Sequence, residues 1–132
     1  MAKENGAQTV YPVSGRNIVY SAGNGKTNID ELIWLCDTVL EEAGAWKNSG
    51  WAYIADCTNM DPVTPHEGTQ LANMTKTFVE NGCKAFAFVE GDSVMLKIQA
   101  KKNTERSQTG VMEGHFETLD QALTWLKDEL NI

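Results

Sequence analysis

The residues of this 132-residue chain that could carry out chemistry gather just after a short apolar run. Cys57 lies there, and the chain has two histidines, His66 and His115, that could act as the base for a thiol nucleophile. His66 falls in the first turn of a predicted helix, where the helix dipole disfavours its protonated form. Nothing in the sequence brings Cys57 to either histidine, so an enzyme that uses Cys57 and His66 is kept only as a remote alternative.

Other catalytic or metal-binding patterns are weaker still. Asp56 and Asp61 could approach a cation, but two carboxylates make a poor site. The segment 25–27 (Gly-Lys-Thr) is similar to the end of a phosphate-binding loop, but Tyr20 occupies the position where that motif needs glycine. We expect no catalytic residue, no metal and no cofactor. The three cysteines are odd in number and lack a CxxC spacing, so we expect free thiols in a reducing cytosol: Cys36, Cys57 and Cys83.

Composition indicates an ordinary globular protein with an acidic surface. Apolar residues make up 42% of the chain and charged residues 22%. We expect a loose tail at residues 1–7 and a single domain at residues 8–132. The net charge of −7 argues against partners with a phosphate backbone and against anionic membrane surfaces. With no long apolar run and no signal-peptide pattern, the expected location is the cytoplasm.

One stretch positions the candidate residues. Residues 51–55 form a short apolar run typical of a buried strand, which we expect to end at Asp56. A polar loop at residues 57–63 follows, and then a helix start in which Thr64 is the cap, Pro65 takes the first helical position and Glu67 completes a capping box. The sequence thus predicts a loop at the carboxyl end of a central strand, which is where α/β proteins usually place their functional residues.

Strand and helix signals alternate along the rest of the chain. The predicted order is β-β-α-β-α-β-α-β-α, which indicates an α/β fold with a mixed, mostly parallel sheet of four or five strands. Pro12 should place the first strand at an edge of the sheet, because proline cannot donate a ladder hydrogen bond. Strands are expected at residues 8–13, 17–22, 51–55, 84–89 and 111–116. Helices are expected to begin at Asn28, at Thr64, at either Asp92 or Ser93, and at Thr118.

Two surface features could mark interfaces. Trp34 falls nearly opposite the apolar stripe of the first helix, so it could anchor a contact such as a homodimer, or the N-terminal segment could cover it. Four of the eleven basic residues lie within ten positions, and this patch is either a solvated face or a surface for an acidic partner: Lys97, Lys101, Lys102 and Arg106.

The closing segment, residues 116–126 (FETLDQALTWL), resembles the STAS-like proteins related to the bacterial sporulation anti-sigma-factor antagonist SpoIIAA. The strand at residues 84–89, which follows a helix ending at Gly82, resembles them too. This resemblance implies a STAS-like α/β fold from about residue 10 to residue 130. It also implies a non-enzymatic regulatory module that docks a protein partner through the loop and helix after its central strand, here Asp56, Thr58, Asp61, Thr64 and His66.

The resemblance carries two further implications. Antagonists of the family carry Asp-Ser-Ser-Gly or a similar sequence in this loop, and phosphorylation of the serine breaks partner binding. Here residues 61–64 read Asp-Pro-Val-Thr, so the phosphoswitch serine is missing, and Thr64 or Thr58 would have to accept the phosphate. The alternative function is binding of a small molecule or lipid in apolar space between helices and sheet, with Leu71, Phe78 and Trp125 as the expected walls.

Overall fold

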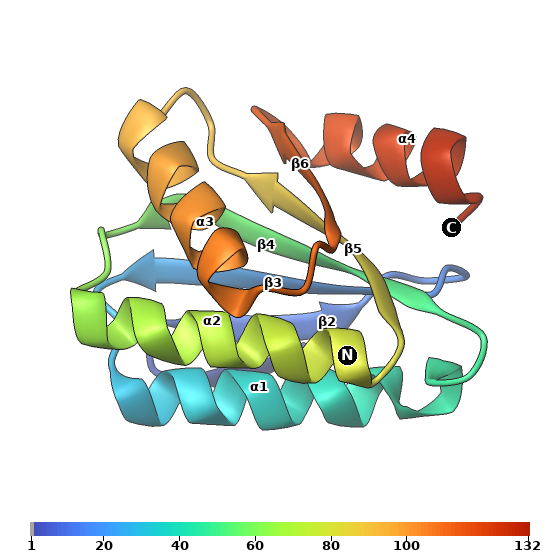
Figure 1. The fold of residues 1–132 in the computed structure, drawn as a ribbon, viewed down its shortest axis with the longest axis horizontal. Coiled ribbons are helices and arrows are strands. Elements are labelled where there is room, and N and C mark those ends of the chain that lie inside the picture. Colours follow the sequence, from blue (N-terminus) through green and yellow to red (C-terminus); the bar gives the residue numbers. More distant parts are fainter. Residues whose placement is uncertain (1) are drawn as a thin grey trace.

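The strands follow one another across a single sheet in their order along the chain, from β1 to β6. The computed structural model describes residues 2–132 and is shown in Figure 1. The first three strands pair antiparallel, and every later pair is parallel. The strands are β1 (Lys3–Asn5), β2 (Gln8–Pro12), β3 (Ile18–Gly25), β4 (Trp51–Met60), β5 (Cys83–Val89) and β6 (Met112–Phe116). The helices are α1 (Ile29–Ala43), α2 (Pro65–Glu80), α3 (Val94–Ser107) and α4 (Leu119–Leu130), with a short 3-10 turn, η1 (Gly44–Trp46), after α1.

Helices α1, α2 and α3 cover one face of the sheet, and α4 covers the other (Figure 1). The three crossovers β3-α1-β4, β4-α2-β5 and β5-α3-β6 all advance across the sheet in one direction. Since parallel crossovers are right-handed, helices that advance in one direction lie on the same face. Helix α4 follows the last strand and is free to fold back on the opposite face.

Side-chain size differs sharply between the two faces of the central strands. Alternate residues of β4 and β5 point to opposite faces. The face beneath α1–α3 carries the bulky side chains Trp51, Tyr53, Phe86 and Phe88, which pack with Phe78 of α2. The face beneath α4 carries small or compact side chains, so that Ala122 and Leu126 approach the sheet closely: Ala52, Ile54, Ala85, Ala87 and Val89.

The predicted helix starts are confirmed. The side chain of each cap residue accepts a hydrogen bond from the backbone N–H three residues on, at Asn28, Thr64, Ser93 and Thr118. Thr64 and Thr118 form complete capping boxes, with Glu67 and Gln121 respectively. These caps satisfy backbone donors that would otherwise be unpaired, and they fix where each helix begins.

The α/β class, the mixed and mostly parallel sheet and the order of the elements are confirmed, but the sheet has six strands. The additional strand, β1, lies in the segment for which we expected a loose tail. It pairs with Gln8–Val10 of β2, and Lys3 contacts Glu41 at 2.5 Å and Glu42 at 3.0 Å on α1. The strand at residues 8–13, which we expected at an edge, is therefore the second strand of the sheet. Because β1 pairs only with Gln8–Val10, Pro12 lies on the part of β2 that β1 leaves uncovered.

Strands β3 and β4 are both longer than expected. We predicted that β3 ends at residue 22 and that residues 23–27 form a loop, but β3 runs to Gly25 and pairs with the extension of β4, which ends at Met60 and not at Asp56. A side chain at position 23 would meet Met60, since a Cβ there would lie 2.6 Å from its Sδ. Gly23 thus leaves room for the Met60 side chain at the end of β4.

Two helices also differ from their sequence patterns. In α1 the apolar Ile33 is 45% exposed, while its neighbours Leu35 and Thr38 are buried. Helix α3 continues to Ser107 although its apolar pattern fades after residue 98, because small and polar residues form its buried side: Ala100, Thr104 and Ser107. No helix in residues 2–132 combines the length and the apolar character needed to cross a bilayer.

The turn between α2 and β5 gives a direct test of this packing. Gly82 has φ +96°, and a Cβ there would lie 2.2 Å from the carbonyl oxygen of Lys47. We expect Gly82→Ala to lower the free energy of unfolding by about 3 kcal/mol or more, because both backbone strain and a backbone clash oppose the new methyl group.

Gly15 is the matched control, since it has φ +74° and a Cβ added there would meet no atom within 4 Å. Gly15→Ala should therefore cost only about 1 kcal/mol, the strain of a left-handed residue. Urea unfolding followed by tryptophan fluorescence measures both. If Gly82→Ala and Gly15→Ala lower the free energy of unfolding equally, the contact with Lys47 is unimportant.

Candidate functional site

The connection between β4 and α2 is an exposed corner with a fixed backbone. We define the docking corner as Asp61–His66. The N–H of Asp61 donates to the carbonyl of Gly25 at 2.9 Å. The Gln99 side chain of α3 binds both backbone groups of Val63, accepting from its N–H and donating to its carbonyl, each at 3.3 Å. Together with the capping box at Thr64, these bonds hold the corner at both ends and in the middle.

The structure brings three of the five predicted partner-binding residues onto the docking corner. Asp61, Thr64 and His66 are exposed there. Thr58 is exposed as well, but it lies in β4 and not in a loop. Asp56 is also part of β4; it is partly buried, and its carboxylate accepts a hydrogen bond from the Tyr20 hydroxyl at 2.6 Å. Burial, followed by this bond to Asp56, raises the pKa of Tyr20.

The Thr64 side chain caps helix α2 and is also exposed to solvent. Its Oγ1 accepts a hydrogen bond from the N–H of Glu67 at 3.2 Å, and its own N–H donates to Glu67 Oε1 at 3.0 Å. A phosphate on Thr64 would face the helix N-terminus, which favours an anion, but it would also face the Glu67 carboxylate, which opposes one. Thr58 is not part of a helix cap, so it has no capping-box glutamate like Glu67 beside it. The N–H of Thr58 donates to Asp56 Oδ1 at 3.1 Å.

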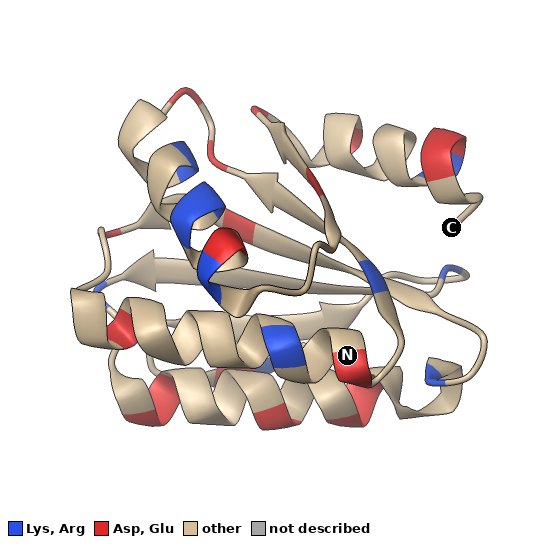
Figure 2. Cartoon of the chain, in the orientation of Figure 1, with Lys and Arg blue, Asp and Glu red and all other residues tan. Residues whose placement is uncertain are grey.

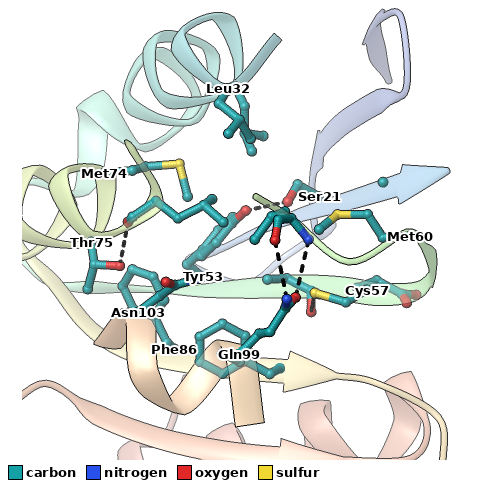
Figure 3. A pocket seen from close by; sticks show the side chains of 18 of the residues that line it. Ser21, Leu32, Tyr53, Cys57, Met60, Met74, Thr75, Phe86, Gln99 and Asn103 are labelled. Atoms are coloured by element: carbon teal, nitrogen blue, oxygen red, sulfur yellow. Dashed lines mark hydrogen bonds between the residues drawn. The ribbon is translucent and has the colours of Figure 1, made fainter. Parts of the chain in front are cut away.

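An apolar cavity of about 70 Å³ lies between the sheet and helices α1–α3 (Figure 3). This is well below the ~300–1,000 Å³ of typical small-molecule sites. Its polar groups are largely occupied: the Ser21 and Tyr53 hydroxyls bond to each other, Thr75 donates to the carbonyl of Leu71 at 3.0 Å, and Gln99 bonds to the docking corner. Its apolar walls include Leu32, Leu35, Met60, Leu71, Met74, Phe86, Phe88 and Leu96.

The expected cavity walls need correction. Leu71 lines the cavity, but Phe78 is fully buried in the aromatic core and does not line it. Trp125 packs with Phe116 under α4, on the other face of the sheet. The sequence could not show which face of the sheet Trp125 covers. Trp125 belongs to α4, and the face that α4 covers depends on the direction in which the chain turns after β6.

Trp34 is half-buried and packs against the main core. It lies on the side of α1 that carries Glu31, about one turn before it, and Glu41, about two turns after it. The N-terminal segment reaches both ends of this side, since Ala7 donates to Glu31 at 3.3 Å and Lys3 pairs with Glu41. This placement favours cover by the N-terminal segment over a free interface anchor.

Comparison with known proteins identifies the architecture. No protein-family model matches the sequence, and no curated protein matches it either. A solved structure from Shewanella loihica PV-4, described as an uncharacterized DUF3478-family protein with a SpoIIAA-like fold, superposes with a TM-score of 0.70 at 15% identity, covering 96% of this chain and 98% of that one. An anti-sigma factor antagonist from Mycobacterium paratuberculosis gives a TM-score of 0.59 at 14% identity, covering 95% and 98%. The chain has a SpoIIAA-like fold.

Within this SpoIIAA-like fold, Cys57 and His66 lie in different surroundings. Cys57 faces the cavity, while His66 is exposed on α2, and no hydrogen bond joins them in residues 2–132. Burial, with smaller contributions from Glu90 and Asp56, raises the pKa of the Cys57 thiol to about 12. A thiol with that pKa is almost entirely protonated at neutral pH and is a poor nucleophile.

Sequence reasoning missed a cluster of three ionisable side chains at the last two strands of the SpoIIAA-like sheet, of which Glu90 and His115 are largely buried. His115 Nδ1 lies 3.0 Å from both carboxylate oxygens of Glu90, and its Nε2 lies 2.9 Å from Glu113 Oε2. The ring stacks on Phe88, with centroids 5.2 Å apart. The available signal was the two-residue spacing of Glu113 and His115 on one strand, which places both side chains on the same face.

The cluster makes stability depend on pH through Glu90. Burial raises the pKa of this carboxyl group, although His115 opposes the shift. A raised pKa in the folded state means that folding favours the protonated carboxyl, so this contribution is present below the ordinary glutamate pKa of about 4.3 and is lost as pH rises through the folded value. Glu90→Gln should therefore flatten the fall in unfolding free energy above about pH 4.

Urea unfolding at a series of pH values between about 4 and 7 checks this slope. Glu117→Gln is the control, because Glu117 is exposed and makes the same change of charge nearby. If the wild type and Glu90→Gln give parallel curves, Glu90 does not contribute to the pH dependence.

Proposed function

We propose that this chain is a regulatory protein-interaction module that binds a protein partner through the docking corner, Asp61–His66. One observation carries the proposal: the corner exposes Asp61, Thr64 and His66 on a backbone that three separate hydrogen-bonded contacts hold in place. A partner that binds a fixed surface avoids the entropic cost of ordering a loop.

The structural neighbours support a protein-binding role, and the names of these proteins indicate no reaction. One of them is named as an anti-sigma factor antagonist. Under this proposal Asp61, Thr64 and His66 make direct contacts, Thr58 lies at the border of the surface, and Asp56 acts through its place in β4. Regulation would come from a phosphate on Thr64 or Thr58, which adds about two negative charges to a surface that already carries Asp61.

Reversing the charge of Asp61, at the start of the docking corner, tests the proposal. Asp61→Lys should reduce capture of specific partners from an extract of the native host by about tenfold or more, as expected when a contact charge is replaced by its opposite. Quantitative mass spectrometry of proteins retained on the immobilised chain provides the measurement. The fold should be unaffected, because Asp61 contributes its backbone, and not its side chain, to the fixed geometry.

Asp128→Lys is the matched control, since Asp128 is exposed on α4 and the charge change is the same. Partners that disappear with both variants respond to net charge alone. Partners that both variants retain equally would rule out the docking corner as their binding surface.

A second candidate function is the binding of a small apolar molecule in the cavity beneath α3. The observation that favours it is the apolar lining of that cavity, which lies directly under the docking corner. The cavity is too small for a drug-sized ligand as it stands, so Met60 or Gln99 would have to move to admit one (Figure 3).

A fluorescent fatty acid is a suitable probe of this second function. If the cavity admits such a chain, the wild type should bind one equivalent, and Leu71→Trp should abolish binding by filling the space. Leu123→Trp, on a half-buried position of α4 at the opposite face, should leave binding unchanged. Absence of saturable binding to the wild type would exclude this function for fatty acids.

A further inference from the structure

The outward face of α3 is apolar and basic at the same time. Val94, Met95 and Ile98 are 70%, 59% and 49% exposed, and they account for three of the five large apolar side chains exposed in residues 2–132. The opposite side of the helix packs into the protein through Leu96, Ala100 and Thr104. Helix α3 is therefore held to the protein by one side while its other side leaves three neighbouring apolar side chains in water.

Lysines surround these apolar side chains. Val94, Ile98 and Lys101 follow one another at helical spacing along the outward face, and Lys97 and Lys102 flank them. Figure 2 shows the basic residues gathered along α3, in contrast to the mainly acidic α1. None of the three lysines forms an ion pair with a carboxylate in the part of the chain that the structure describes. Glu105 is the single acidic residue of the helix.

We propose that this outward face, made up of Val94, Met95, Lys97, Ile98, Lys101 and Lys102, is a docking surface for an acidic amphipathic segment of a partner protein. The partner's apolar side chains would cover Val94 and Ile98, and its carboxylates would pair with the lysines. The surface lies on a different helix from the docking corner, and the proposal does not rest on that corner being used.

Charge complementarity selects an acidic protein segment. The chain carries a net charge of −7, so its field as a whole repels a broad anionic surface such as a membrane. A narrow acidic segment can pair with the three lysines directly, whereas a broad anionic surface also meets the acidic residues of the rest of the chain. Apolar contacts at the centre and charges at the border are the usual arrangement of a protein interface.

A synthetic helical peptide with leucines at i and i+4, bordered by glutamates, is the probe. We expect saturable binding by fluorescence anisotropy, and we expect it to weaken about tenfold or more in the variant K97E/K101E/K102E. Val94→Ser combined with Ile98→Ser should weaken it several-fold without changing the charge. Since all five positions are exposed, circular dichroism should show that both variants are folded.

The matched control is K47E/K84E/K127E, which changes the net charge equally at exposed lysines outside α3 and should bind the peptide as the wild type does. Asp61→Lys should also bind normally, which separates this surface from the docking corner. The proposal is overturned if the wild type does not bind the peptide, or if both lysine triples lose it equally.

Other occupants give different results in the same set of proteins. Binding to phosphatidylserine vesicles, lost in K97E/K101E/K102E while peptide binding is absent, would assign the face to a membrane. Salt-sensitive self-association, measured in the ultracentrifuge, would assign the outward face of α3 to a second copy if K97E/K101E/K102E abolishes it. Adding Asp37→Lys on the acidic helix α1 should then restore it, because the charges of the two surfaces are exchanged. Either result would replace the proposed partner.

Discussion

The alternation of large and small side chains along β4 and β5 is the constraint on which the architecture depends. Aromatic side chains fill one face of these strands, and alanines occupy much of the other. The aromatic face needs a thick cover, which three helices supply, while the alanine face admits a single helix at close range. Because side chains of a strand alternate with a period of two, a shift of one residue in either strand would exchange the faces and bury neither set properly.

This arrangement of faces also determines where the exposed surfaces lie. Parallel strands bring their carboxyl ends to one edge, so the docking corner and the start of α3 lie near each other at the same end of the sheet. Gln99 joins the two directly, since its amide binds both backbone groups of Val63. The loop after β4 therefore has a defined geometry although its own side chains are mostly in solvent.

Local signals predicted much of this structure, and long-range contacts account for what they missed. The four caps depend on residues three positions apart, so the sequence shows them directly. The extension of β4 pairs with residues of β3, a different strand, and Gly23 there leaves room for the Met60 side chain. Residues 3–5 pair with β2, and Lys3 also contacts Glu41 and Glu42 of α1, so the structure of this segment involves partners distant in sequence. The candidate corner was predicted, but the turning of Asp56 toward Tyr20 and the burial of Glu90 beside His115 required the paired strands.

The two margins of the sheet share a property that bears on solubility. An open edge strand offers unpaired backbone groups to any other strand, which is a common route to aggregation. Here β1 is only three residues long and begins with Lys3 and Glu4, while β6 carries the hydrogen-bonded side chains of Glu113 and His115 on one face. A foreign strand added beside β6 would strip water from the partly exposed Glu113 carboxylate without offering it a new partner. Glu113 thus opposes strand addition at β6, the longer open margin of the described sheet.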